Sequence, residues 1–271
     1  MTGRVERWSE RVTRVLAPNP SAMTLEGTNT YVVCEPASGT ALVIDPGPPD
    51  DGHALRVAGA CEGRRIELVL LTHAHADHAE GARELAGRAG APLAALAPGW
   101  STPGAPALRP DRALAAAGTR LVPVPTPGHS ADHCCFVLAA ERAMFTGDHV
   151  LGRGTTVVDW PEGDMGDYFR SLSVLLDYDL DRLYPGHGPL VPDAGAKVDE
   201  YLAHRRMRER QVLGALAAGD RTPSEVVARV YAEVDPALHP AAERSVRAHL
   251  AKLVREGRAR VEGGAFVVDL Q

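Results

Sequence analysis

The chain has 271 residues, of which 45% are hydrophobic and 24% are charged. This is the composition of a globular protein, and it excludes a disordered, fibrous or collagen-like chain. The formal net charge of −6 argues against a surface built as a whole for nucleic acid.

Short apolar runs dominate the first 190 residues. Residues 30–33 and 41–44 flank a turn-prone segment and predict a β-hairpin. Residues 66–71 predict a strand and residues 80–88 a helix, because alanine and leucine recur in the second segment at helical spacing. Many strands with few helices between them favour a layered α/β protein. The remaining elements expected in this part are strands over 93–96, 121–124, 134–138, 143–146 and 182–184, with a helix over 168–176.

After residue 192 the pattern becomes helical. Helices are expected over 198–216 and 241–256, and Thr222 with Glu225 forms the capping-box signature of a helix that runs to residue 230. Two short runs around Gly263 then predict a β-ribbon. Three helices and a terminal ribbon describe a winged-helix module. We therefore predict two domains, residues 1–195 and a winged-helix-like domain over residues 196–271.

The sequence contains no run of about 18 apolar residues, and its first ten residues include four charged ones and no apolar signal segment. We therefore expect a cytoplasmic protein with no membrane partner. A reduced compartment agrees with the cysteines, which are too few for a disulfide scaffold and form no C-x-x-C pair. They are Cys34, Cys61, Cys134 and Cys135.

Residues 73–78 read HAHADH and lie between a predicted strand and a predicted helix. A lone histidine is usually an ordinary core or surface residue, but three within six positions favour a metal site. Imidazole and carboxylate without thiolate suit Zn²⁺ and related ions. Three more candidate ligands lie at or beside strand ends, each next to a glycine that allows close backbone approach. The full candidate set is His73, His75, Asp77, His78, His129, Asp148 and His187.

Together with Asp45, this ordered set resembles the metallo-β-lactamase superfamily over essentially all of the first 190 residues. The resemblance implies a four-layer αβ/βα sandwich and makes residues 1–195 the catalytic domain. It implies two zinc ions per chain and a metal-bridging hydroxide as nucleophile, with Asp77 as the catalytic residue that orients the hydroxide or shuttles its proton. Asp45 would orient ligands from behind. The implied ligands are His73, His75 and His129 for one ion and Asp77, His78 and His187 for the other, with Asp148 bridging both.

A closer resemblance is to the lactamase-β-like branch, whose animal members are mitochondrial endoribonucleases. Three segments and the predicted winged helix carry it: TLEGTNTY over 24–31, GRGTTV over 152–157 and HRRMRE over 204–209. This resemblance makes Asn29 and His149 candidate substrate contacts, although a polar residue that merely lines the site is the more usual interpretation of His149.

Three functions remain open at this point. The branch resemblance favours cleavage of single-stranded RNA phosphodiesters by a dinuclear zinc hydrolase. The acidic first domain, with a net charge of −8 over residues 1–196, leaves a thioester or lactone hydrolase of acyl-CoA, acyl-carrier or glutathione type as the alternative. A winged-helix regulator with a ligand-sensing metal domain ranks below both, because the ligand set is complete.

The tail offers one candidate RNA contact surface. Arginines lie opposite the apolar stripe expected for the last helix and beside the expected ribbon, a geometry suited to nucleic acid. The alternatives are a plain solvated face, packing over the active site, or self-association. The residues are Arg244, Arg247, Arg255, Arg258 and Arg260.

Overall fold

The computed structural model describes residues 3–110 and 112–269, which fall into two compact units. Unit 1 holds the chain up to Thr126 together with residues 132–155 and 178–195. Unit 2 holds residues 127–131, 156–177 and the tail from residue 196. Two short segments of the first 195 residues therefore group with the tail.

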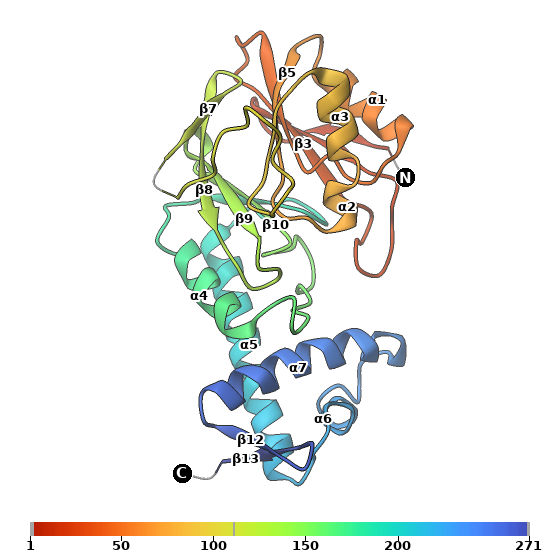
Figure 1. The fold of residues 1–271 in the computed structure, drawn as a ribbon, viewed down its shortest axis with the longest axis vertical. Coiled ribbons are helices and arrows are strands. Elements are labelled where there is room, and N and C mark those ends of the chain that lie inside the picture. The colour runs from red at the N-terminus through yellow and green to blue at the C-terminus, as the bar shows by residue number, and fades with distance from the viewer. Residues whose placement is uncertain (1–2, 111, 270–271) are drawn as a thin grey trace. The chain divides into compact units, whose positions relative to one another are not determined.

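Unit 1 contains a six-stranded sheet whose strands follow one another in sequence order. The first four strands pair antiparallel, whereas β4, β5 and β6 pair parallel. Helices α1 (Asp51–Ala60) and α3 (Ala82–Ala89) pack on this sheet (Figure 1), and the single turn α2 (Ala76–Ala79) precedes α3. The strands are β1 (Val5–Arg7), β2 (Val12–Leu16), β3 (Asn29–Val33), β4 (Thr40–Ile44), β5 (Arg65–Leu70) and β6 (Leu93–Ala94).

A second sheet of unit 1 has five strands in the order β11-β10-β9-β8-β7. Only β10 and β11 pair parallel. The 3₁₀ turn η1 (Ala139–Glu141) connects β9 to β10. The strands are β7 (Leu114–Ala116), β8 (Thr119–Pro125), β9 (Cys134–Leu138), β10 (Ala143–Gly147) and β11 (Arg182–Pro185).

Aromatic side chains from both sheets meet in one core. The ring of Tyr31 on β3 lies 5.0 Å from that of Phe145 on β10 and 5.8 Å from that of Tyr184 on β11, measured between centroids. All three side chains are buried. The two sheets therefore face each other across a shared apolar layer.

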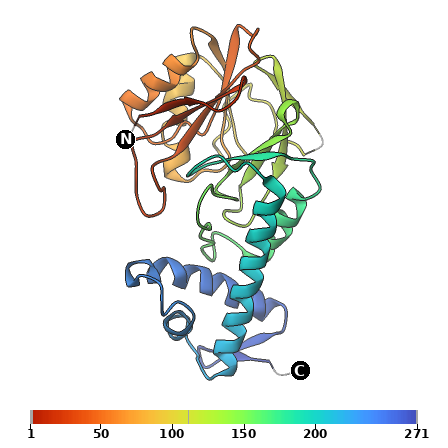
Figure 2. The same cartoon turned by 180° about the vertical axis from the view of Figure 1, so that it is seen from behind.

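Unit 2 contains the helices of the second half of the chain and the terminal ribbon (Figure 2). The side chain of Thr222 accepts from the backbone N–H of Glu225 and the capping box is complete, as predicted. Val246, Leu250 and Leu253 are fully buried and form the predicted apolar stripe. The elements are α4 (Met165–Leu175), α5 (Ala194–Ala217), α6 (Pro223–Val230), η2 (Pro236–Leu238), α7 (His239–Arg255), β12 (Ala259–Glu262) and β13 (Ala265–Val268).

Every element expected from the sequence is present within a few residues, whereas the elements not anticipated are β1, β2, β7, α1 and the short turns α2, η1 and η2. Helix α1 buries only His53 and Val57, so it has no apolar stripe to detect. The apolar run of strand β2 is interrupted by Arg14. This side chain is buried and forms an ion pair with Glu6 at 2.5 Å, which the sequence does not show. The four cysteines are free and buried. Among the described helices, none has the length and apolarity needed to cross a bilayer.

Candidate metal centre

The candidate ligands of unit 1 follow the carboxyl ends of three strands. His73 and His75 come just after β5, Asp148 directly follows β10, and His187 comes two residues after β11. Carboxyl ends of parallel strands lie at one edge of a sheet, which is where β4 with β5 and β10 with β11 deliver these loops. The backbone N–H of Asn29 donates to the Gly186 carbonyl at 2.7 Å and joins the two edges.

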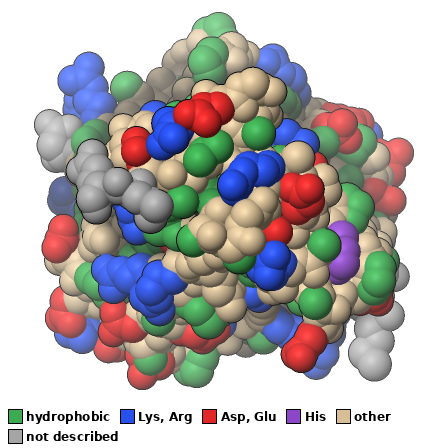
Figure 3. Space-filling model, turned by 90° about the horizontal axis from the view of Figure 1, so that it is seen from below, with side chains coloured by type: hydrophobic (Ala, Val, Ile, Leu, Met, Phe, Trp, Pro, Cys, Tyr) green, Lys and Arg blue, Asp and Glu red, His purple; other side chains and the backbone are tan. Residues whose placement is uncertain are grey.

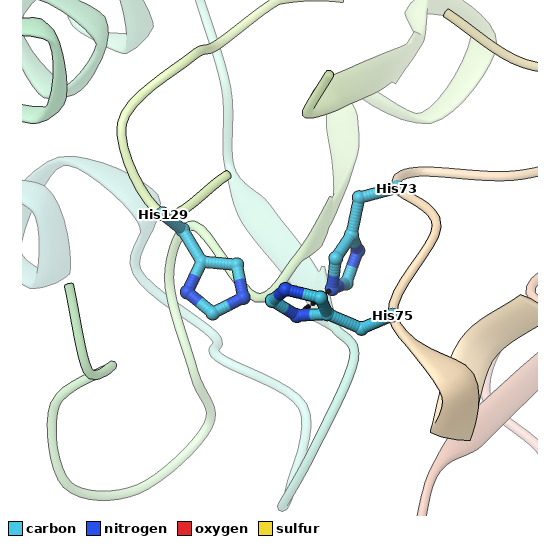
Figure 4. Close-up of side chains that lie close together, drawn as sticks. All are labelled: His73, His75 and His129. Atoms are coloured by element: carbon cyan, nitrogen blue, oxygen red, sulfur yellow. Dashed lines mark hydrogen bonds between the residues drawn. The ribbon is translucent and has the colours of Figure 1, made fainter. Parts of the chain in front are cut away.

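Ligand atoms gather there in three overlapping groups, within each of which they lie no more than 4.8 Å apart. Figure 4 shows the imidazoles of the first group turned toward one another, with His73 Nε2 3.0 Å from His75 Nδ1. All seven ligands expected from the sequence belong to these groups. The groups are His73, His75 and His129; His73, His78 and Asp148; and Asp77, His78 and His187.

Four donor atoms of unit 1 already have the spacing of a metal shell. His187 Nε2 lies 3.1 Å from Asp77 Oδ2 and 3.3 Å from Asp148 Oδ1, and His78 Nε2 lies 3.2 Å from His187 Nε2 and 3.3 Å from Asp148 Oδ1. Bonds of about 2.0–2.1 Å from one tetrahedral ion would set its ligand atoms about 3.3–3.4 Å apart. These residues therefore fit a metal ion without rearrangement.

The charges of this group are strongly coupled. Burial by itself lowers the pKa of His78 and of His187, but nearby carboxylates, Asp148 foremost, outweigh it and raise the pKa of His187 to about 9 and that of His78 well above its usual range. Burial likewise raises the pKa of Asp148, yet the two imidazoles hold it well below its usual value. Without a cation, protons occupy the site that a metal ion would take, so metal binding must release protons.

Asp45 forms hydrogen bonds to the candidate ligand His78 and to the backbone just before His73. Its Oδ2 lies 2.9 Å from His78 Nδ1 and accepts from the Thr72 hydroxyl at 2.7 Å, while its Oδ1 accepts from the Thr72 backbone N–H at 2.7 Å. The acceptor at Nδ1 leaves His78 Nε2 to face the metal position. That Asp45 orients the ligands, as the family resemblance implies, stays a prediction.

The sequence did not reveal several further supports of the ligand loops. Asp132 Oδ2 accepts from the backbone N–H of Ala74 at 2.9 Å, and His133 Nε2 accepts from that of Asp148 at 3.2 Å. Gly186 has no room for a side chain, because a Cβ there would lie 2.7 Å from both Asp148 Oδ1 and His78 Cε1. The glycine beside each of the three downstream ligands, His129, Asp148 and His187, was the sequence signal for such crowding.

The two candidate substrate contacts are both fully buried. The side-chain amide of Asn29 donates to the carbonyls of Pro185 and Gly188 and accepts from Arg14 Nε at 2.6 Å, so it supports the loop that carries His187. His149 lies beside His133, with ring centroids 5.8 Å apart. Substrate contact by either residue stays a prediction.

The five arginines of the candidate RNA contact surface all have carboxylate partners within unit 2. Arg244 pairs with Asp159 at 3.3 Å, and Arg255 makes a two-point contact with Asp164, the N-cap of α4. Figure 3 shows basic and acidic side chains interspersed on the face that it draws. This basic surface is thus largely neutralised within the unit. The other three pairs are Arg247 with Glu243, Arg258 with Glu209, and Arg260 with Glu262.

The fold and the histidine–aspartate clusters define a hydrolase of the metallo-β-lactamase class. Residues 23–187 match the model of the metallo-beta-lactamase superfamily, and residues 222–265 match that of the beta-lactamase associated winged helix domain. The chain belongs to the metallo-β-lactamase superfamily. The predicted family, the α/β sandwich fold and the C-terminal winged helix are confirmed.

Several named proteins are similar to this chain along most of its length. The chain is 35% identical to a "Beta-lactamase-like protein 2 homolog" of Caenorhabditis elegans, over 93% of this chain and 87% of the relative. It is 38% identical to the "Atrochrysone carboxyl ACP thioesterase" of Aspergillus chevalieri, over 85% of this chain and 76% of the relative. A metallo-beta-lactamase family protein from Thermus thermophilus has the same fold, with a TM-score of 0.80 at 22% identity over 97% of this chain and 100% of that one.

Proposed function

We propose that the protein is a dinuclear zinc hydrolase that cleaves acyl thioesters. The observation that carries the dinuclear assignment is the overlap of the three ligand groups, in which His73 and His78 each take part in two. His73, His75 and His129 would hold one ion, and Asp77, His78 and His187 the other. Asp148 would be shared, because it forms a ligand group with His73 of the first set and His78 of the second, and its Oδ1 lies 3.3 Å from His187 Nε2.

Zinc supplies two kinds of chemistry when it is bound, a water whose pKa falls toward about 7 and a Lewis acid for the substrate oxygen. Asp77 would be the residue that accepts and transfers the proton. Its side chain is 29% exposed, against 13% for Asp148. Burial raises the pKa of Asp77, but the opposing effect of His78 and His187 is larger, so the net pKa is lowered. Asp77 therefore remains a carboxylate at neutral pH and can accept a hydrogen bond from the attacking water.

Two observations favour an acyl thioester as substrate. One relative that aligns along most of this chain is named a thioesterase of an acyl carrier protein. The arginines proposed as an RNA footprint are paired with carboxylates, so contact with phosphates would first have to break those pairs. Cleavage of single-stranded RNA, and the lactone and regulatory alternatives, stay as outcomes of the same test.

The test assays one purified preparation, reconstituted with zinc, on acyl-CoA, acyl-carrier-protein and acyl-glutathione thioesters, on an acyl lactone and on single-stranded RNA, with the metal content measured alongside. We expect close to two zinc ions per chain and thioester hydrolysis. Asp77→Asn should lower kcat/KM by roughly three orders of magnitude or more, because it removes a ligand and the proton acceptor together.

The matched control is Glu80→Gln, an exposed carboxylate just after α2, which should leave both quantities unchanged. A folded protein that takes up no zinc would contradict the metal assignment. Turnover of RNA but of no thioester would contradict the substrate class, and absence of turnover on every substrate would favour the regulatory alternative.

A further inference from the structure

The loop of unit 2 that carries His129 is held on one side by α4. The hydroxyl of Ser171 donates to the Pro127 carbonyl at 2.7 Å, and the backbone N–H of Asp164 donates to the Gly128 carbonyl at 2.8 Å. Gly128 has φ +141°, and a Cβ there would lie 2.4 Å from the Cα of Tyr168. Little freedom is left to the backbone next to His129.

The imidazole of His129 is held on its other side by the segment after Gly154. Its Nδ1 lies 2.8 Å from the carbonyl oxygen of Val157. A carbonyl oxygen can only accept, so Nδ1 carries the proton and Nε2 keeps its lone pair for a metal ion. The orientation of this ligand therefore depends on where the backbone of residues 156–157 is fixed.

Arg205 on α5 fixes that backbone from behind. It is 3% exposed, and its Nη2 donates to the carbonyl oxygen of Thr156, the residue before Val157. Its guanidinium carbon lies 5.1 Å from the centroid of the Tyr168 ring, and Tyr168 packs against Gly128. One side chain thus contacts both supports of His129.

Burying the charged guanidinium of Arg205 at this position is energetically unfavourable compared with burying an apolar side chain. Among the described residues, no carboxylate lies within ion-pairing distance of its guanidinium, and its Nε has no hydrogen-bond partner. A buried cation bound only to a neutral carbonyl and an aromatic face stabilises a fold less than an apolar side chain of similar volume would. What an apolar residue could not do is hold the Thr156 carbonyl in place.

We infer that Arg205 is a positioning residue for the metal ligand His129, acting through the backbone of Thr156 and Val157. The inference rests on the proposed function in one respect, that His129 binds a metal ion. The hydrogen bond from Arg205 to Thr156 connects two segments that carried the branch resemblance but had no assigned role. These are GRGTTV over 152–157 and HRRMRE over 204–209.

The test measures zinc affinity by competition with a chromophoric chelator, in Arg205→Met, Arg205→Lys and the control Arg206→Met. Arg206 is the exposed neighbour on the same helix. Residues that orient a metal-binding histidine typically contribute about 10–100-fold to affinity. We expect a loss of that size for the more weakly bound ion in Arg205→Met, a smaller loss in Arg205→Lys, which keeps a cationic hydrogen-bond donor, and no loss in Arg206→Met.

Unfolding of the metal-free variants separates positioning from a merely structural role. A lowered unfolding midpoint of metal-free Arg205→Met combined with wild-type affinity for both ions would overturn the inference. Should Arg205→Met not fold, Arg205→Lys decides, and wild-type affinity in that variant would overturn the inference too. Failure of the proposed function is distinguishable, since the wild-type protein itself would then not bind two ions.

Discussion

At the scale of single residues, Asp45 connects the backbone and a ligand of the metal centre through one carboxylate. Both of its oxygens are in use, toward the Thr72 N–H, the Thr72 hydroxyl and His78 Nδ1. Its φ is +50°, in the left-handed region that asparagine tolerates at least as well as aspartate. Replacing Asp45 by asparagine therefore tests the charge and the acceptor without adding backbone strain.

We predict that Asp45→Asn lowers the zinc affinity by about 10–100-fold, because an amide N–H2 would face either Thr72 or His78 where an acceptor is needed. Competition titration with a chelator measures it. Asp51→Asn is the control, since that carboxylate is exposed and forms its ion pair with Arg88, away from the metal centre. Unchanged affinity in Asp45→Asn would show that the ligands hold their orientation without this charge.

At the scale of an element, the glycine in helix α5 and the glycine in a metal-centre loop differ in the space around them. Gly214 lies near the end of this helix, is exposed, and a Cβ there would meet no atom within 4 Å. Gly186 is the opposite case, because its missing side chain makes space for Asp148 and His78.

We predict that Gly214→Ala raises the free energy of unfolding by about 0.5–1 kcal/mol, since alanine loses less backbone entropy in a helix. Urea unfolding of the metal-free protein measures this. Gly186→Ala is the comparison, and its added methyl group should displace ligand atoms and weaken zinc binding. A destabilised Gly214→Ala variant would mean that the end of α5 is not helical in solution.

At the scale of the whole molecule, the charge of the metal centre couples stability to pH. The pKa of His187 is about 9 in the folded metal-free protein, above its ordinary value of 6.5. A pKa raised by folding contributes stability that is fully present below the unfolded value and is lost as the pH rises through the folded one.

We therefore predict that the free energy of unfolding of the metal-free protein falls as the pH rises from about 6.5 to about 9. The zinc-loaded protein should change in the opposite direction over this window, because metal binding requires deprotonated imidazoles. Denaturant unfolding at a series of pH values, with and without zinc, measures both. A metal-free protein that becomes more stable over this range would contradict the assigned coupling between His187 and its carboxylates.

Signals between residues close in sequence predicted much of the secondary structure correctly. The apolar stripe of Val246, Leu250 and Leu253 and the capping box at Thr222 each depend on residues within a few turns, and both are present as predicted. Strand β2 escaped prediction because the partners that allow Arg14 to be buried lie on other strands.

The sequence by itself determined the ligand types, their places after strands and the family, because these depend on residue identity and on local order. Only the tertiary structure decided how the side chains share their partners. Arg255 contacts Asp164, 91 positions away, and Arg205 reaches Thr156, 49 positions away. No periodicity or spacing encodes such contacts, since they exist only once packing has fixed α4, α5 and α7 against one another within unit 2. For the same reason, arginines that looked like a free basic face proved to be paired, and a buried arginine with no motif of its own became the support of a metal ligand.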